Sequence, residues 1–295
     1  MRVLVTGGTG FVGTSVIHAL RAQQTEVRVL ARSRERAARA AAWGAEVVTG
    51  DVTDPAGLVA AADGCTHVVH LVAIIKGRPE DFERVMVDGT RNVAAAAEHA
   101  GAGRLVLMSA LGTSEATRDT VPYYRAKWEM EQIARGAALE HVILRPSFVF
   151  ARSGGALPTF VRQVRLSPVV TVLGPGSQRS QPIWLDDLAA SVAASLVDPG
   201  AANRTLELGG PDVVTWNELY RAIARTLGKR RRLVHVPFAL ARAAARATQA
   251  LPGAPLTVDQ VTMLAGPDNV VSNDDAQSVF GLPLVPLAEQ LRRAV

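Results

Sequence analysis

The segment PYYRAKW (122–128) places two tyrosines just ahead of a lysine. On a helix, Tyr123 and Lys127 are four residues apart and share a face, and Tyr124, three residues before Lys127, can also reach it. A phenol has an ordinary pKa of about 10, and a nearby ammonium favours the phenolate. The spacing therefore predicts an acid/base pair. The alternative is an exposed helix with aromatic packing.

Lysine is rare in this chain, which makes its presence at position 127 informative. Of the 32 basic residues only Lys76, Lys127 and Lys229 are lysines, and the chain has 3 tyrosines. A position that needed only positive charge would be expected to carry arginine, as almost all others do. The retained lysine indicates a demand for a compact ammonium rather than a planar guanidinium.

A glycine-rich loop, TGGTGFVG (6–13), follows the first β-type run and opens a helical pattern. Gly7, Gly10 and Gly13 allow a tight turn, a close approach of the backbone to a pyrophosphate, and close packing of helix on strand. The helix N-terminus adds free N–H groups and positive potential. Because the glycines stand in the required strand-turn-helix context, they predict a dinucleotide site. The alternative is an ordinary glycine-rich turn.

The end of the second β-type run decides which dinucleotide is expected. Sites for NAD usually have an acid there for the ribose hydroxyls, but this chain has LARSR (30–34). Arg32 and Arg34 could clamp a 2′-phosphate, which favours NADP(H) over NAD(H). They could also simply decorate a helix start. Asp51, after the third run, is placed to accept from the adenine amino group or to cap the turn before Pro55.

Six β-branched runs alternate with Ala-rich helical patterns in the first half of the chain. The predicted strands are 2–6, 26–31, 45–50, 66–73, 104–109 and 140–145, and two of the predicted helices are 10–22 and 89–99. This alternation indicates an α/β fold, a Rossmann-type doubly wound parallel sheet, over residues 1–150.

Proline and glycine punctuate the chain more often after Pro146. We expect residues 151–295 to form a smaller, mostly helical region for substrate or partner binding, with strands that partly rejoin the first sheet. Helices are predicted at 187–197, 216–227 and 239–250, and Thr215 with Glu218 forms a capping box for the second of these.

Composition bounds the class of protein. The net charge is +5, yet no aromatic residues interleave a basic stripe, so nucleic-acid binding is not expected. The single cysteine, Cys65, allows no intrachain disulfide and fits a reducing compartment. Apolar runs are too short to span a bilayer, and no signal peptide is evident. A soluble, cytoplasmic protein is expected.

Three weaker candidates have ordinary explanations. Cys65, His67 and His70 lack the spacing of a metal site, so no metal is expected. Asp186 and Asp187 are better read as a helix cap than as a catalytic dyad. The basic run 229–232, followed by a helical pattern over 238–251, could touch an anionic membrane, although a solvated turn and surface helix are favoured.

The motifs TGGTGFVG (6–13), YYRAK (123–127) and LRPSFVF (144–150) together resemble the short-chain dehydrogenase/reductase superfamily, in its extended or atypical, epimerase/dehydratase-like branch. The segments HLVAII (70–75), QPIWLDDLA (181–189), LELGGPDVVTWNELY (206–220) and PLTVDQVTML (255–264) are similar to bacterial relatives of the accessory NADPH-binding subunit of respiratory complex I. The resemblance covers essentially the whole chain.

The resemblance implies roles only where residues match. Tyr123 and Lys127 match the catalytic pair, and Lys127 also binds the nicotinamide ribose. Ser109 lies near the end of the fifth strand, where a catalytic hydroxyl is usual. The implied cofactor-binding residues are Gly7, Thr9, Gly10, Phe11, Val12, Gly13, Arg32, Arg34, Asp51, Val52, Leu71, Val72, Ala73, Pro146 and Ser147.

Two departures from the superfamily pattern bear on activity. The best register puts Ala110 at the catalytic hydroxyl position and Ser109 one residue early, and strand side chains alternate faces. Thr113 or Ser114 could substitute. Met86 stands where active members often carry asparagine.

An oxidoreductase that moves hydride between nicotinamide and a carbonyl, alcohol or quinone-like substrate is therefore expected. The alternatives are a weakly active or inactive NADPH-holding structural or sensor protein, and a sugar-nucleotide epimerase or dehydratase. The similarity to the complex I subunit implies peripheral association with a membrane or a respiratory complex.

Overall fold

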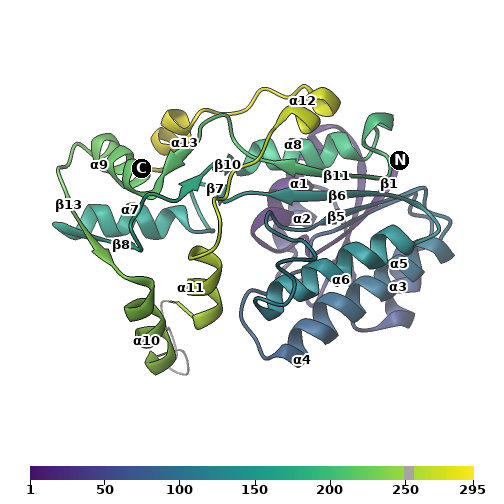
Figure 1. Ribbon diagram of the computed structural model, residues 1–295. Helices are drawn as coiled ribbons and strands as arrows, with labels where there is room; N and C mark the ends of the chain where they lie inside the picture. Colours follow the sequence, from purple (N-terminus) through teal and green to yellow (C-terminus); the bar gives the residue numbers. More distant parts are fainter. Residues whose placement is uncertain (249–255) are drawn as a thin grey trace. The chain divides into compact units, whose positions relative to one another are not determined.

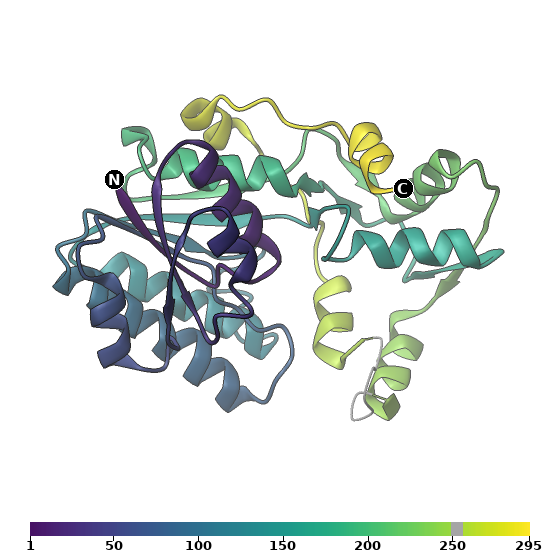
Figure 2. The same ribbon diagram turned by 180° about the vertical axis from the view of Figure 1, so that it is seen from behind.

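The computed structural model describes residues 1–248 and 256–295, and the chain divides into two compact units (Figures 1 and 2). The first unit comprises 1–146, 185–208 and 273–283, and the second comprises 147–184, 209–272 and 284–295. Residues 249–251 of the predicted helix and basic segment, and residue 255 of the PLTVDQVTML motif, lie outside the described part.

A seven-stranded parallel sheet forms the centre of the first unit, in the order β11-β6-β5-β4-β1-β2-β3. This confirms the predicted Rossmann-type fold class. The strands are β1 Arg2–Thr6, β2 Glu26–Ala31, β3 Glu46–Thr49, β4 His67–His70, β5 Arg104–Met108, β6 Glu140–Pro146 and β11 Arg204–Leu208.

The central strands are buried on both faces, which explains why they read as continuous β-branched runs rather than as alternating ones. Val3, Val5, Val68, Val69 and Leu105 are all fully buried. Helices α1 (Phe11–Ala22) and α8 (Leu185–Ser195) pack together on one face of the sheet, and α3 (Pro55–Ala62), α5 (Gly89–His99) and α6 (Pro122–Gly136) cover the other face (Figure 1).

The strand order reverses direction between β1 and β4, which are hydrogen-bonded neighbours. In open parallel sheets, ligands bind beyond the carboxyl ends of the strands at such a switch point. The loops that follow β1 and β4 are therefore the first place to look for a site. Strand β4 ends at His70, three residues before the predicted end, because Leu71 to Ala73 leave the sheet along the glycine loop.

The rest of the first unit consists of short helices, and one of them is a π-helix. These elements are α2 Ala38–Ala42, α4 Pro79–Phe82, the π-helix η1 Glu83–Asp88, the 3₁₀ helix η2 Pro199–Ala201 and α12 Asp274–Phe280. The helical prediction for 89–99 is confirmed by α5, but the π turn before it carries no sequence signal that we recognised.

The second unit is built around a small apolar cluster of its own, made by α7, α9, α13 and β8. Its elements are β7 Val149–Phe150, α7 Leu157–Leu166, β8 Val169–Leu173, β9 Arg179–Ser180, β10 Ile183–Trp184, β12 Val214–Thr215, α9 Trp216–Thr226, β13 Arg232–Val236, α10 Phe238–Thr248, α11 Val258–Leu264 and α13 Leu287–Ala294. The predicted capping box is present, since the Thr215 side chain accepts from the Glu218 N–H and the Glu218 carboxylate accepts from the Thr215 N–H.

Candidate active site

The glycine loop fits a dinucleotide pyrophosphate. Gly7 has φ +73°, and a Cβ atom there would lie 2.8 Å from the backbone carbon of Leu71. A Cβ atom on Gly13 would lie 2.2 Å from the Gly7 carbonyl oxygen. Helix α1 begins after Gly10 with no side chain capping its N-terminus. The loop thus keeps its backbone close and its first N–H groups unclaimed by side chains, as a pyrophosphate requires.

The loop after β4 lies against the glycine loop. The Leu71 N–H donates to the Thr6 carbonyl at 3.0 Å, and Gly7 approaches the backbone of Leu71 and Val72. Leu71 and Val72 are half-buried and Ala73 is exposed. The structure therefore brings Leu71, Val72 and Ala73 together with the phosphate loop at the switch point.

The two arginines after β2 are exposed. Within the described residues, neither Arg32 nor Arg34 forms an ion pair with a carboxylate. A guanidinium that no internal acid engages remains available to a ligand phosphate.

The two residues after β3 are partly engaged within the protein. One carboxylate oxygen of Asp51 accepts from the N–H of Thr53 at 2.9 Å and from its hydroxyl at 2.8 Å, so Asp51 does cap its own turn. Val52 is 5% exposed, and its carbonyl accepts from the Asn92 amide at 3.0 Å. The Val52 side chain belongs to the core cluster, and its role toward the cofactor stays a prediction.

Lys127 is buried to 1% exposure, and its ammonium donates to the Met108 carbonyl at 2.6 Å. Burial lowers the pKa of Lys127 to about 7, and the charge of Glu131 acts in the opposite direction. A buried arginine would bring a larger planar group into this place, which agrees with the retention of lysine.

Of the two tyrosines, Tyr123 is the one that faces Lys127. The Lys127 nitrogen lies 5.9 Å from the centroid of the Tyr123 ring, whereas the Tyr124 hydroxyl packs against Gly112. Burial, and then Tyr124, raise the pKa of Tyr123. Burial therefore opposes the phenolate, and the expectation that Lys127 together with the positive nicotinamide ring favours it stays a prediction.

Ser109, the hydroxyl expected near the pair, is bonded to a buried carboxylate. Ser109 is 3% exposed, and its hydroxyl donates to the Glu131 carboxylate at 2.5 Å. Glu131 is fully buried, and its carboxylate also accepts hydrogen bonds from two arginines. Arg145 donates through Nε at 2.8 Å and through Nη2 at 2.7 Å, and Arg135 donates at 2.8 Å. Ser109 is thus a partner of this carboxylate, as expected for a residue one position away from the catalytic register.

Glu131 was missed by the sequence reasoning, although a signal existed. Tyr123, Lys127 and Glu131 follow each other at intervals of four and form one stripe along α6. Burial acts to raise the pKa of Glu131, but hydrogen bonds from Arg145, Ser109 and Arg135 outweigh it and hold that pKa below its usual value. The carboxylate therefore stays charged and ties α6 to the ends of β5 and β6.

The two hydroxyls expected as substitutes, those of Thr113 and Ser114, are each bonded to another side chain. Thr113 is buried, with Ser109 as its hydroxyl partner at 3.5 Å, and Ser114 pairs with the Thr117 hydroxyl at 3.0 Å. Ala110 is half-buried and has no polar side chain.

A buried hydrogen-bond chain runs from the end of β1 to the π-helix. Thr90 donates to the Met86 carbonyl at 2.5 Å, so it accepts from His70 Nε2 at 3.0 Å. His70 Nδ1 is then the acceptor from the Thr6 hydroxyl at 2.6 Å. Burial, with the charge of Lys127, lowers the pKa of His70 to about 3, so this imidazole is neutral. Met86, in the asparagine position, contributes its backbone to this chain.

Pro146 ends β6 in the first unit, and Ser147 begins the second. The Ser147 hydroxyl donates to the Gln181 carbonyl. That bond explains its burial within the second unit.

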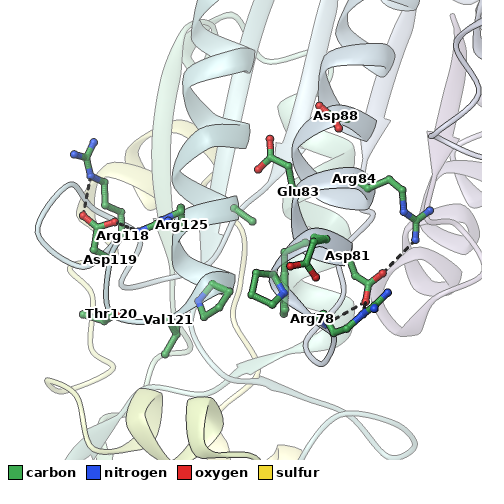
Figure 3. A pocket seen from close by; sticks show the side chains of 15 residues that line it. Arg78, Asp81, Glu83, Arg84, Asp88, Arg118, Asp119, Thr120, Val121 and Arg125 are labelled. Atoms are coloured by element: carbon green, nitrogen blue, oxygen red, sulfur yellow. Dashed lines mark hydrogen bonds and ion pairs between the residues drawn. The ribbon is translucent and has the colours of Figure 1, made fainter.

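A cavity of about 880 Å³ lies beside the start of α6 (Figure 3). Arginines and acids line it, and two ion pairs, Arg118–Asp119 and Arg84–Asp81, form between residues of its lining. Neither Tyr123 nor Lys127 lines this cavity, although Val121, Pro122 and Ala126 do. The cavity is therefore distinct from the place of Tyr123 and Lys127.

Within the described part of the chain, no three His, Cys, Asp or Glu side chains are arranged to hold a metal ion. Cys65 is buried against the Ala61 carbonyl, and His67 is hydrogen-bonded to the Thr66 hydroxyl. His70 is hydrogen-bonded to the Thr6 and Thr90 hydroxyls described above. Asp186 and Asp187 lie in the first turn of α8 rather than ahead of it. None of the described helices is both long and apolar enough to cross a membrane.

A profile described as the NAD dependent epimerase/dehydratase family matches residues 3–209. The chain belongs to that family. The match spans the phosphate loop, the Tyr123–Lys127 helix and the last strand of the sheet. It confirms the expectation of a nicotinamide dinucleotide cofactor at the level of the family.

Curated relatives include several reductases. The chain is 33% identical over 236 residues to a ceramide reductase of Caulobacter vibrioides, covering 80% of this chain and 73% of the relative. It is 29% identical to a 4-hydroxy-2-methyl-3-oxo-4-farnesyl-3,4-dihydroquinoline-1-oxide ketoreductase of Stigmatella aurantiaca, covering 85% and 80%. These relatives support the expected oxidoreductase rather than the structural or epimerase alternatives.

The similarity to a complex I subunit is also confirmed. Subunit 9 of the NADH dehydrogenase [ubiquinone] 1 alpha subcomplex of Arabidopsis thaliana is 28% identical over 303 residues, covering 96% of this chain and 73% of that protein.

Solved structures share the fold. An NADPH-dependent quinone oxidoreductase of Escherichia coli, complexed with NADPH, superposes with a TM-score of 0.79 at 21% identity, covering 98% of each chain. A short-chain dehydrogenase/reductase superfamily protein from Agrobacterium tumefaciens with bound NAD gives 0.76 at 23%, covering 100% and 96%. The fold thus accommodates both dinucleotides.

Proposed function

We propose that this protein reduces a carbonyl group of a lipophilic substrate with NADPH. The observation that carries the proposal is the pair on α6, in which Lys127 is held by the Met108 carbonyl at 2.6 Å and lies over the ring of Tyr123. Such a pair is suited to general acid/base work beside a nicotinamide.

The chain's own residues would hold the cofactor along the switch point. The glycine loop and the start of α1 meet the pyrophosphate, and Arg32 and Arg34 meet a 2′-phosphate, which is why we favour NADP(H) over NAD(H). One oxygen of Asp51 is engaged by Thr53, which leaves the other for the adenine amino group.

When bound, the nicotinamide supplies the hydride that adds to the carbonyl carbon. Tyr123 donates its hydroxyl proton to the carbonyl oxygen, so the C=O becomes a CH–OH and the phenolate remains to be reprotonated from solvent. Lys127 stabilises that phenolate, because an ammonium beside a phenolate favours the charged form.

The substrate class follows from what the relatives are named for. Their printed substrates are a ceramide and a farnesylated quinoline oxide, and a structural neighbour is named for quinones. The ceramide and the farnesylated quinoline oxide both carry long hydrocarbon chains. We therefore propose a ketone or quinone that carries a lipid or isoprenoid chain. The single buried cysteine suits a cytoplasmic setting, and the Arabidopsis relative raises association with a respiratory complex.

The test is single-turnover oxidation of protein-bound NADPH, followed by absorbance, with a long-chain 3-ketone and a prenylated quinone as substrates. Tyr123→Phe should slow the reaction at least a hundredfold, because the proton donor is removed. Tyr124→Phe is the matched control and should stay within about threefold, since its hydroxyl packs against Gly112.

Two results would go against the proposal. Equal rates in the two variants would remove Tyr123 from the chemistry. Tight NADPH binding without turnover of any carbonyl substrate would instead favour a protein that holds the cofactor for a partner, for which the alanine at position 110 is the supporting observation.

A further inference from the structure

Charge is divided unevenly between the two units. The second unit contains 14 Lys and Arg against 5 Asp and Glu, a net charge of +9, whereas the first contains 18 against 22, a net charge of −4. The overall +5 therefore hides a basic second unit joined to an acidic first one. A strong asymmetry of this kind points to an anionic partner for the basic part.

The positive charge gathers where two stretches without any acid meet. No Asp or Glu occurs from 147 to 185 or from 219 to 258. Arg231 joins the two stretches, because its guanidinium donates to the Val164 carbonyl at 2.7 Å and to the Arg165 carbonyl at 3.4 Å, at the end of α7. The turn before β13 is thereby held against the end of α7, and Arg165, Arg230 and Arg232 are all exposed there.

The strands that continue from these cations form a two-stranded parallel sheet, β8 with β13, in which Arg232 pairs with Val169 (Figure 1). One face of β8 is core, since Val170 and Val172 are buried in the apolar cluster. On the other face Val169 and Thr171 are exposed and Leu173 is half-buried.

Large aliphatic side chains are exposed among the arginines. Leu166 is 70% exposed, Val234 43% and Val169 41%. We call the set Arg165, Leu166, Val169, Arg230, Arg232 and Val234 the basic ribbon. Among the described residues, none of its three arginines forms an ion pair.

The kinds of side chain in the basic ribbon indicate which of two anionic partners, a nucleic acid or a lipid bilayer, is the better match. Nucleic-acid surfaces offer bases for stacking, and proteins that bind single strands supply exposed aromatic rings. In the described part of the chain, no aromatic residue is among the exposed large hydrophobics. Aliphatic side chains between arginines match the interface of a bilayer, where the apolar groups enter the acyl boundary and the cations meet lipid phosphates.

We propose that the basic ribbon docks the second unit on an anionic lipid bilayer. The inference does not depend on the reaction, because docking is measured without turnover, and each can fail alone. If both hold, a lipophilic substrate would be taken at the surface in which it dissolves.

The test is co-sedimentation of the full chain with vesicles of phosphatidylcholine alone and of phosphatidylcholine with 30% phosphatidylglycerol. Binding should need the anionic lipid and should weaken as salt rises from about 50 to 300 mM, because surface charges are then screened. The triple change Arg165→Gln, Arg230→Gln and Arg232→Gln should lower the partition coefficient roughly a hundredfold, at roughly fivefold for each cation.

A matched control removes the same charge from the first unit, with Arg36→Gln, Arg84→Gln and Arg91→Gln, and should retain binding within about threefold. Leu166→Ser should weaken binding a few-fold at unchanged charge. NADPH binding by each variant reports that the chain is folded.

Equal binding to both vesicle types, or equal losses in the two triple variants, would overturn the proposal. Tighter binding to a short DNA duplex than to the vesicles, lost in the ribbon variant, would make the ribbon a nucleic-acid site instead and would also overturn it.

Discussion

The ammonium of Lys127 donates to the main-chain carbonyl of Met108 at 2.6 Å, and this bond joins the middle of α6 to the last residue of β5. Four residues further along α6, Glu131 accepts from the Ser109 hydroxyl, the next residue after Met108. Two successive positions at the end of β5 are thus held by two successive turns of the helix. Tyr123, one turn earlier, is positioned by the same pair of attachments.

Lys127 should make stability depend on pH in the alkaline range. Burial lowers its pKa to about 7 in the folded chain, against about 10.4 when unfolded. Between these values the unfolded state binds more protons, so stability rises with pH. At about 1.4 kcal/mol per pH unit, wild type should gain about 2 kcal/mol between pH 7.5 and 9.5 relative to Lys127→Met. Urea unfolding of both proteins at both pH values measures this, and an unchanged difference would contradict it.

Gly13 should tolerate no side chain. A Cβ atom there would stand 2.2 Å from the Gly7 carbonyl oxygen, which is backbone and cannot move aside without opening the loop. Gly13→Ala should therefore weaken NADPH binding at least thirtyfold in a fluorescence titration, since the loop must approach the pyrophosphate closely. Gly136→Ala is the matched control, because nothing lies within 4 Å of its Cβ position, and it should bind normally. Normal binding by Gly13→Ala would dismiss the loop as the phosphate site.

Arg32 and Arg34 should discriminate between the two dinucleotides. Their removal in Arg32→Ala with Arg34→Ala should raise the Kd for NADPH roughly 10- to 100-fold, the worth of one charge-assisted contact to a phosphate. The Kd for NADH should change less than about threefold. Arg36→Ala, an exposed neighbour, serves as the control. Parallel losses for both dinucleotides would show that the arginines do not contact a 2′-phosphate.

Substitutions at Ser109 and Glu131 should show whether these residues act in the structure or in the reaction. Glu131→Gln leaves the guanidinium of Arg145 without its buried partner and should cost about 3–5 kcal/mol of unfolding free energy. Ser109→Ala removes one hydrogen bond and should cost about 1 kcal/mol. Its single-turnover rate at saturating NADPH should stay within about threefold of wild type, because the hydroxyl faces Glu131. A hundredfold slower rate in a stable Ser109→Ala protein would restore Ser109 to the catalytic group.

Local patterns predicted the elements of the first unit well. The strands 2–6 and 26–31 and the helix 89–99 end where expected. The reason is that β-branched runs indicate strands and Ala-rich amphipathic stretches indicate helices without reference to other parts of the chain. Boundaries moved where tertiary contacts decide them. Strand β4 is shorter than its apolar run, since Leu71 leaves the sheet to lie against Gly7.

The candidate site divides in the same way. Tyr123, Lys127 and the three glycines could be read from type and spacing, because each function needs a particular residue at a fixed interval on one element. Which tyrosine faces the lysine could not be read, since both spacings are compatible with a helix. The packing of Tyr124 against Gly112 decides it.

The amino-acid sequence by itself determined the Rossmann-type fold, the position of the glycine loop between β1 and α1, and the four-residue spacing of Tyr123 and Lys127 on one helix. Only the tertiary structure decided that Ser109 belongs to Glu131, that burial works against the phenolate of Tyr123, and that two acid-free stretches meet at Arg231. The physical reason is common to all three. Periodicity and residue type act within one element, whereas burial, charge and hydrogen bonding depend on which other elements pack against it.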